Sequence, residues 1–190
     1  MKVAAIPAIV VLAFLTTCAP AFAKTHAPAV KDQQSTAHQD TKFLEDATQG
    51  SVDEIDLAQI ALKKSNNEDV KAFAQKMVHD HTMLIENMQS FANEAGLKKP
   101  EHDSIATDAL KVKLEVLSGE AFDRAYIKAM VEDHHKDLMA FEKEIKATGY
   151  PAFKEAVEKG AEVVRGHLEM INDIAKKNGV APAPVPHSAS

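Results

Sequence analysis

The sequence is poor in the residues that build disulfide-rich folds and thiolate metal sites. Cys18 is the only cysteine among 190 residues, which excludes a disulfide framework and a zinc site made of cysteines. Tryptophan is absent and only seven residues are glycine. Basic residues are outnumbered, with 22 Lys and Arg against 28 Asp and Glu, for a net charge of −6. This balance argues against a nucleic-acid-binding protein.

The residues that are abundant favour a helical domain. Alanine, lysine, glutamate and methionine are good helix formers. With 45% hydrophobic and 26% charged residues, the composition is that of a folded chain rather than a disordered one. Nine residues are histidine, and their positions carry most of the functional information in the sequence.

Residues 1–23 have the features of a secretory signal peptide. Lys2 precedes an apolar run over residues 3–15, and residues 21–23 (Ala-Phe-Ala) form a small-residue cleavage signal. The run is too short for a membrane span. We therefore predict an exported protein, periplasmic or secreted, whose mature chain begins at Lys24 and contains no integral membrane span.

Cys18 offers a second way to process this leader. Residues 15–18 loosely resemble a lipoprotein signal, which would make Cys18 a lipidated N-terminus. Thr17 fits such a signal poorly, so we favour cleavage after Ala23. The mature chain then has no thiol, and neither thiol catalysis nor thiolate ligation is available to it.

Two tails are predicted to flank the domain. Residues 24–39 lack an apolar period and are expected to form a flexible arm, and residues 180–190 form a Pro-rich extended tail. Cleavage after Ala23 places His26 third in the mature chain. A free amine, two backbone nitrogens and this imidazole form a square-planar set suited to Cu(II) or Ni(II). A chance histidine in a solvated tail is the simpler explanation of His26, because the signal is only three residues long.

Residues 40–179 are expected to form one all-α domain. Four long helices are predicted, over about 40–65, 67–96, 118–149 and 151–178, and each has apolar residues at a spacing of three to four. Capping residues, glycine and proline mark their ends. Four long amphipathic helices are typical of a four-helix bundle.

An internal repeat constrains the order of these helices. Residues 77–81 and 130–134 share the pattern Met-Val-x-Asp-His, near the middle of the second and third predicted helices. The connection between these helices is long and contains a short helical piece around residues 104–116. We predict that it crosses the length of a ferritin-like bundle, so that the two helices run parallel. A plain up-and-down bundle with a decorated loop is the alternative.

Each predicted long helix has one polar residue in the middle of its apolar face: Glu54, His81, His134 and His167. We expect the four side chains to meet at the centre of the bundle. Buried imidazoles and carboxylates need partners, and a Zn, Fe, Mn or Cu ion would supply one. Met77 and Met130 lie one turn before two of the histidines, and a thioether beside an imidazole would favour copper.

A structural interpretation explains the same residues without a metal. Asp80 and Asp133 precede two of the histidines, and with Glu54 they could complete a hydrogen-bond network or a pH-sensitive cluster. Methionine at helical spacing is a common core residue. The sequence leaves a metal site and a hydrogen-bonded core both open.

Enzymatic motifs are scarce. A di-iron bundle needs the Glu-x-x-His motif twice, facing inward, with two further glutamates. Here the motif occurs once, as Glu132 to His135, and faces outward. No G-x-S-x-G, phosphate-binding loop or H-E-x-x-H is present. We therefore favour a protein without enzymatic activity and leave the question open.

Several segments together resemble the bacterial domain-of-unknown-function 4142 family. They are residues 70–78, 117–126, 141–144 and 165–168, with the Asp-His pairs 80–81 and 133–134. The resemblance spans about residues 41–175. It implies an exported, ferritin-like helical bundle, and it implies no settled activity.

Two functions from different classes fit these observations. The first is a metal-binding or stress-related exported bundle with a central His/Glu cluster. The second is a non-catalytic interaction or structural module of the cell envelope, a homo-oligomer or bound to an envelope partner, whose cluster is a core hydrogen-bond network. Elemental analysis of the natively exported protein separates the two.

Overall fold

The computed structural model describes residues 30–186, and side chains from residue 37 onward. This part of the chain contains five helices and no strand: α1 (Val30–Lys64), α2 (Glu68–Glu94), α3 (Ile105–Glu115), α4 (Gly119–Ala147) and α5 (Pro151–Lys177). The expected all-α class is therefore confirmed. The signal peptide, Cys18, His26 and His187 lie outside the described residues.

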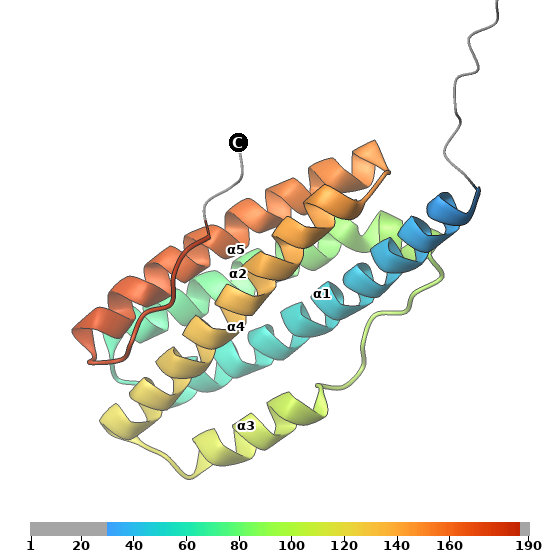
Figure 1. Cartoon of the computed structure of the whole chain (residues 1–190). Helices are drawn as coiled ribbons and strands as arrows, with labels where there is room; N and C mark the ends of the chain where they lie inside the picture. The colour runs from blue at the N-terminus through green and yellow to red at the C-terminus, as the bar shows by residue number, and fades with distance from the viewer. Residues whose placement is uncertain (1–29, 187–190) are drawn as a thin grey trace, which may run out of the picture.

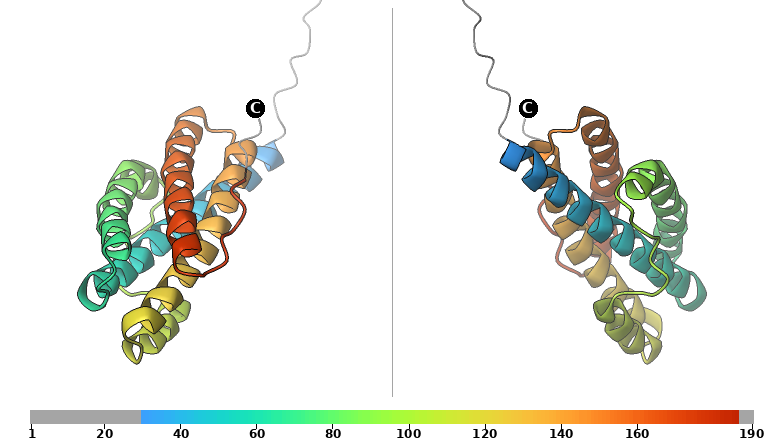
Figure 2. Two further views of the ribbon diagram at one scale, coloured as in Figure 1. Left: turned by 90° about the vertical axis from the view of Figure 1, so that its left-hand side faces the viewer. Right: turned by 90° about the vertical axis from the view of Figure 1, so that its right-hand side faces the viewer.

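The four long helices lie alongside one another, with α1 against α2 and α4 against α5 (Figure 1). The two pairs are joined by contacts of α2 with α5 and of α1 with α4. Figures 1 and 2 show α2 and α4 running in the same direction and α1 and α5 in the opposite one. The chain returns from the end of α2 to the start of α4 through a connection that contains α3 and contacts α1 and α4. The fifth helix is thus the short piece expected within this connection.

The first helix begins earlier than predicted. The structure starts α1 at Val30, so the predicted flexible arm over residues 24–39 is wrong for residues 30–39. A helix therefore forms here without an apolar period in the sequence. Adding a residue to an existing helix fixes far fewer torsions than starting one. The packed part of α1 therefore extends backward through a largely polar stretch of sequence.

The other long helices begin and end within two residues of the predicted positions, because local signals determine their ends. The Asn67 side chain accepts hydrogen bonds from the amides of Asp69 and Val70 at the start of α2. Pro151 occupies the first turn of α5. Gly96 and Gly179, just beyond α2 and α5, have φ of 71° and 64°. These left-handed conformations suit glycine and stop the helices.

The apolar faces of the long helices form the core, and Gly160 of α5 packs closely against the Phe141 side chain of α4. A Cβ at this position would lie 2.5 Å from Cε1 of Phe141, so only glycine fits without a shift. The core is not uniformly apolar. His81, His134 and His167 are at most 2% exposed and lie in its interior.

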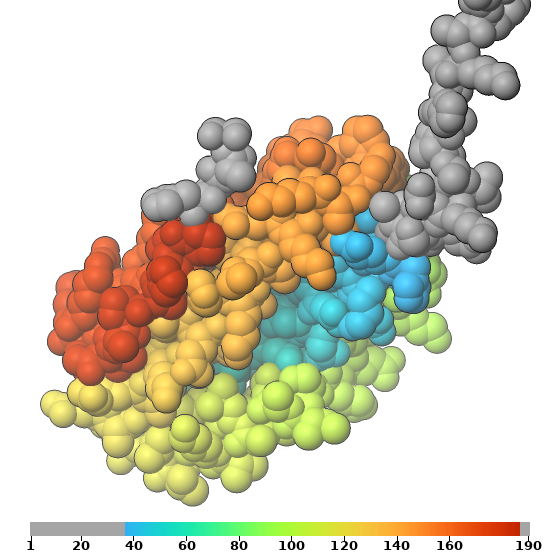
Figure 3. Space-filling view, viewed as in Figure 1, coloured from blue at the N-terminus to red at the C-terminus, as the bar shows by residue number. Residues whose placement is uncertain are grey.

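The C-terminal segment lies on the bundle instead of extending away from it (Figures 1 and 3). The Asn172 side chain donates to the carbonyl of Ala183 and accepts from its amide, both at 2.8 Å. Nδ1 of His135 donates to the Pro184 carbonyl at 2.9 Å, so this histidine is not simply solvated as its outward position had indicated. Val185 packs against the core. The predicted tail is extended, and its residues 180–186 are part of the folded domain.

No helix in the described part of the chain has the length and apolar character to cross a bilayer.

Candidate metal centre

Three imidazoles from three helices meet in the core, as the sequence predicted. His81 lies on α2, His134 on α4 and His167 on α5. One ring nitrogen of each lies within 4.8 Å of those of the other two. Their ring centroids are 5.2 to 5.9 Å apart.

His167 is held by a carboxylate from a neighbouring helix. Its Nε2 lies 2.8 Å from Oδ2 of Asp80, which also pairs with Lys76 at 2.6 Å. A carboxylate accepts, so Nε2 of His167 carries the proton and Nδ1 keeps its lone pair. Burial raises the pKa of Asp80, but the hydrogen bonds from Lys76 and His167 outweigh it and lower the pKa.

The tautomer of His134 is determined by a backbone carbonyl. Its Nδ1 lies 2.9 Å from the carbonyl oxygen of Met130, one turn earlier on α4. A carbonyl oxygen only accepts, so Nδ1 carries the proton and Nε2 keeps the lone pair.

Glu54 on α1 contacts the Nδ1 atoms of two imidazoles. Its Oε2 lies 3.2 Å from Nδ1 of His81, and its Oε1 lies 3.3 Å from Nδ1 of His134. Ser51 also approaches Nδ1 of His81, at 3.3 Å. Towards an ionised Glu54, Nδ1 of His81 donates and Nε2 keeps the lone pair.

The second nitrogen of each imidazole has no partner. Nε2 of His81, Nε2 of His134 and Nδ1 of His167 are buried and make no hydrogen bond. Burying a polar atom without a partner costs about 1–3 kcal/mol. Three such atoms in adjacent rings are therefore an unusual and costly arrangement, and a cation would relieve it.

The electrostatics keep the imidazoles neutral. Burial lowers the pKa of all three rings, with a further lowering from neighbouring imidazoles for His81 and His134. The pKa of His134 falls to about 3. Neutral imidazole is the form that binds metals, so at neutral pH the three rings are ready to act as ligands.

Of the remaining predicted ligands, Glu54 lies outside the group of three nitrogens. Glu54 contacts the opposite, Nδ1 side of two rings. Met77 and Met130 are fully buried. The main-chain carbonyl of Met130 accepts the hydrogen bond from Nδ1 of His134.

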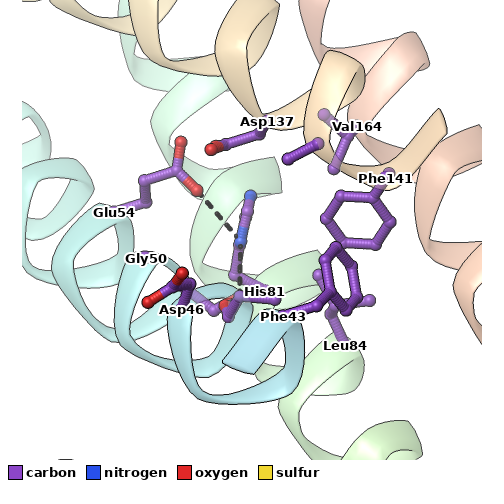
Figure 4. A pocket seen from close by; sticks show the side chains of 12 residues that line it. Phe43, Asp46, Gly50, Glu54, His81, Leu84, Asp137, Phe141 and Val164 are labelled. Carbon is purple, nitrogen blue, oxygen red and sulfur yellow. Dashed lines mark hydrogen bonds and ion pairs between the residues drawn. The ribbon is translucent and has the colours of Figure 1, made fainter. Parts of the chain in front are cut away.

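A pocket of about 100 Å³ lies beside this centre and is lined by His81, but not by His134 or His167. Figure 4 shows Glu54 and His81 on its wall, with the carboxylates of Asp137 and Glu54 facing one another and the rings of Phe43 and Phe141 opposite. Sequence reasoning missed Asp137. It lies on α4 one turn after His134, a spacing that could have drawn attention to it.

Comparisons with known proteins agree with this fold. The crystal structure of a DUF305 protein from Streptomyces coelicolor, described as a candidate secreted protein, superposes with a TM-score of 0.65 at 16% identity, over 78% of this chain and 98% of that one. An identity this low establishes a shared helical fold only. No curated protein matches the sequence significantly. The family model described as Domain of unknown function (DUF4142) matches residues 25–174, so the chain belongs to that family, as its sequence resemblance predicted.

Proposed function

We propose that this protein is an exported metal-binding bundle that holds one transition-metal ion between His81, His134 and His167. One observation carries the proposal, namely three neighbouring imidazoles that each bring one ring nitrogen within 4.8 Å of the others and each have one buried nitrogen without a partner. In each ring the opposite nitrogen contacts an oxygen atom. This arrangement is usual around metal-bound histidines, where outer hydrogen bonds orient the rings.

A water molecule matches this arrangement less well than a cation does. With Glu54 ionised, all three inward nitrogens are acceptors, whereas water has only two protons to donate. A metal ion accepts all three lone pairs at once. Three protein nitrogens also leave a fourth coordination position open, as in metal sites that exchange their ligands.

The class of metal follows from the donors. Neutral imidazoles suit Zn, Cu, Fe and Ni, with Mn weaker at nitrogen sites. The site would favour copper over the other metals if the thioether of Met77 or Met130 bound the ion together with the imidazoles. Glu54 is better suited to orient His81 and His134 than to bind the ion, because it contacts their Nδ1 atoms.

The second candidate function is a structural module whose histidine cluster is a hydrogen-bond network, and Glu54 favours it. Burial, together with nearby Asp137, raises the pKa of Glu54. A protonated Glu54 donates to one Nδ1, which reverses the tautomer of that ring. Its Nε2–H then points toward the other imidazoles, and no ion is needed.

The proposal also includes where the protein acts and what the bound ion is for. The leader over residues 1–23 directs the chain to the periplasm or the medium, and the four long helices with α3 in their crossover form a ferritin-like bundle. Metal handling or protection against stress in the envelope fits a buried, exchangeable ion. His26 adds an N-terminal Cu(II) or Ni(II) site if cleavage follows Ala23.

Metal titration of the exported, chelator-stripped protein tests the proposal. We expect one Zn²⁺ or Cu²⁺ per chain bound in the core, and a loss of at least about tenfold in affinity for His81→Ala or His134→Ala, as for removal of a ligand. His79→Ala is the matched control, because His79 is an exposed histidine on the same helix. Equal affinity of all four proteins would reject the core site.

A second readout separates metal loss from misfolding. Helical content and the urea midpoint of each ion-free variant show whether the bundle has formed. If a folded His134→Ala variant still binds the ion like the wild type, the structural module is the better account. His26→Ala, measured with Cu²⁺, reports on the N-terminal site alone.

A further inference from the structure

We propose that the pocket beside the three imidazoles is a second cation site, where the carboxylates of Asp137 and Glu54 bind a divalent cation that prefers oxygen ligands. This site is distinct from the three-nitrogen centre. Its ligands are the carboxylate oxygens of Glu54 and Asp137, whereas the ligands of the other centre are three imidazole nitrogens.

The first observation is a buried carboxylate oxygen beside the pocket that accepts no hydrogen bond. Nδ1 of His134 lies 3.3 Å from Oε1 of Glu54 but donates its proton to the carbonyl oxygen of Met130. Glu54 is only 4% exposed, and its Oε1 is buried without accepting a hydrogen bond. Glu54 and Asp137 both line the pocket, and Figure 4 shows their carboxylates turned toward each other. A buried carboxylate oxygen without a donor is costly, and a cation between the two groups would remove that cost.

The second observation is an excess of negative charge around the pocket, which Lys136 compensates only in part through its ion pair with Asp133. The negative charges of Asp137, Asp133 and Asp53 act on Glu54. Over residues 37–186, no lysine or arginine forms an ion pair with Glu54 or Asp137. Asp46, which lines the pocket nearer the N-terminal end of α1, pairs with Lys42. Burial, followed by the charge of Asp133, raises the pKa of Asp137 to about 7, although Lys136 acts in the opposite direction.

The donors and the size of the pocket indicate the class of ion. Carboxylate oxygens suit Mn²⁺, Mg²⁺ and Ca²⁺, whereas imidazole nitrogens suit Zn²⁺ and Cu²⁺. Two protein carboxylates leave most of the coordination sphere to water, as is usual for Mg²⁺ and Mn²⁺. A pocket of about 100 Å³ has room for such waters, since one water occupies about 30 Å³ in the liquid.

Mn²⁺ is the most useful probe, because its binding removes the electron paramagnetic resonance signal of the free ion. The titration uses the full mature protein with the substitution His167→Gln, which deletes one imidazole ligand. His167 contacts Asp80 and does not line the pocket, so the substitution removes no group of the proposed second site. We expect one Mn²⁺ per chain in this background.

Asp137→Asn, added to the same background, is expected to weaken Mn²⁺ binding by at least tenfold. Asp108→Asn, at an exposed position on α3, is the matched control and is expected to bind as tightly as the parent. Thermal unfolding gives an independent readout. Mn²⁺ is expected to raise the midpoint of the parent and of Asp108→Asn, and to leave Asp137→Asn unchanged.

The outcomes separate this proposal from that of the three-imidazole centre. Absence of a Mn²⁺ site in both the wild type and His167→Gln, or equal affinity of Asp137→Asn and Asp108→Asn, overturns the second site. Loss of Mn²⁺ binding on His167→Gln alone would assign the ion to the imidazoles and also overturn it. Mn²⁺ binding that depends on Asp137 supports it even if Zn²⁺ and Cu²⁺ do not bind at the imidazoles.

Discussion

Oδ2 of Asp80 accepts a hydrogen bond from Nε2 of His167 at 2.8 Å, across the contact between α2 and α5. Asp80 directly precedes His81, yet it orients an imidazole from another helix. The corresponding aspartate of the second Asp-His pair, Asp133, contacts Lys136 instead. The two copies of the internal repeat therefore have different roles.

This difference gives a matched pair of substitutions. Asp80→Asn removes the charge that orients His167 and stabilises its Nε2–H, so we expect metal affinity to fall by about 10- to 100-fold, as for other outer partners of metal-bound histidines. Asp133→Asn is expected to change the affinity much less. Competition with a chromophoric chelator measures both, and an equal effect of the two substitutions would argue against an orienting role for Asp80.

The ion-free protein should lose stability in acid. Because burial lowers the pKa of His134 to about 3 from an ordinary 6.5, the unfolded chain binds a proton between these values that the folded state does not. Above pH 6.5 this difference in proton binding does not change the free energy of unfolding. As the pH falls toward 3, it lowers that free energy by at most about 1.4 kcal/mol per pH unit for each such group. Urea unfolding at pH 7, 5 and 4 measures the decline.

His134→Gln is the control for this dependence, because glutamine does not titrate. We expect a shallower decline between pH 6.5 and 4 in this variant than in the wild type. Identical slopes would mean that the pKa of His134 is not lowered in the folded protein.

The titration of Asp137 should change the stability of the ion-free protein in the opposite direction. Its folded-state pKa of about 7 lies above the ordinary 3.8, so the ion-free protein loses stability as the pH rises between these values. Asp137→Asn removes the titrating group. The variant should therefore be more stable than the wild type at pH 8 in the presence of a chelator, with little difference at pH 4. A lower stability of the variant at pH 8 would contradict the raised pKa.

The close approach of α4 and α5 predicts opposite effects at two glycines of one helix. Gly160→Ala places a Cβ 2.5 Å from Phe141, and such overpacking typically costs about 1–3 kcal/mol. Gly166→Ala meets nothing within 4 Å and should stabilise α5 by up to about 1 kcal/mol, through the higher helix propensity of alanine. Chemical denaturation of both variants tests the sign of each change.

The C-terminal segment should contribute to stability through Asn172. Asn172→Ala removes two hydrogen bonds to Ala183 and should cost about 1–3 kcal/mol, at about 0.5–1.5 kcal/mol for each bond. Asp173→Ala, at an exposed neighbour, is the control. If both variants unfold at the same urea concentration, the segment is not held by these bonds.

Periodicity and capping signals were sufficient to predict the helices and the positions of the histidines along the helix axes. His81, His134 and His167 each interrupt an otherwise apolar face, and helices of similar length bring them to one level. The start of α1 was not predictable in this way. A helix that continues from a packed segment requires no apolar period of its own.

The partners of the imidazoles depend on details that a pattern does not contain. Periodicity assigns Asp80 and Asp137 to the flanks of their helices, and whether a flanking residue meets solvent or a neighbour depends on how the helices are rotated. The same holds for His135, whose outward position on α4 gives no indication of its hydrogen bond to the carbonyl of Pro184. Distances of a few ångströms decide these roles, whereas a periodicity has a resolution of about one residue.

Anomalous diffraction from crystals of the exported protein grown with Zn²⁺ tests the central claim most directly. Our account predicts one strong anomalous peak in the core, within bonding distance of Nε2 of His81, Nε2 of His134 and Nδ1 of His167, and no such peak in His134→Gln. An empty core in the wild type, with Glu54 hydrogen-bonded to the imidazoles, would contradict the account and identify the cluster as a structural network.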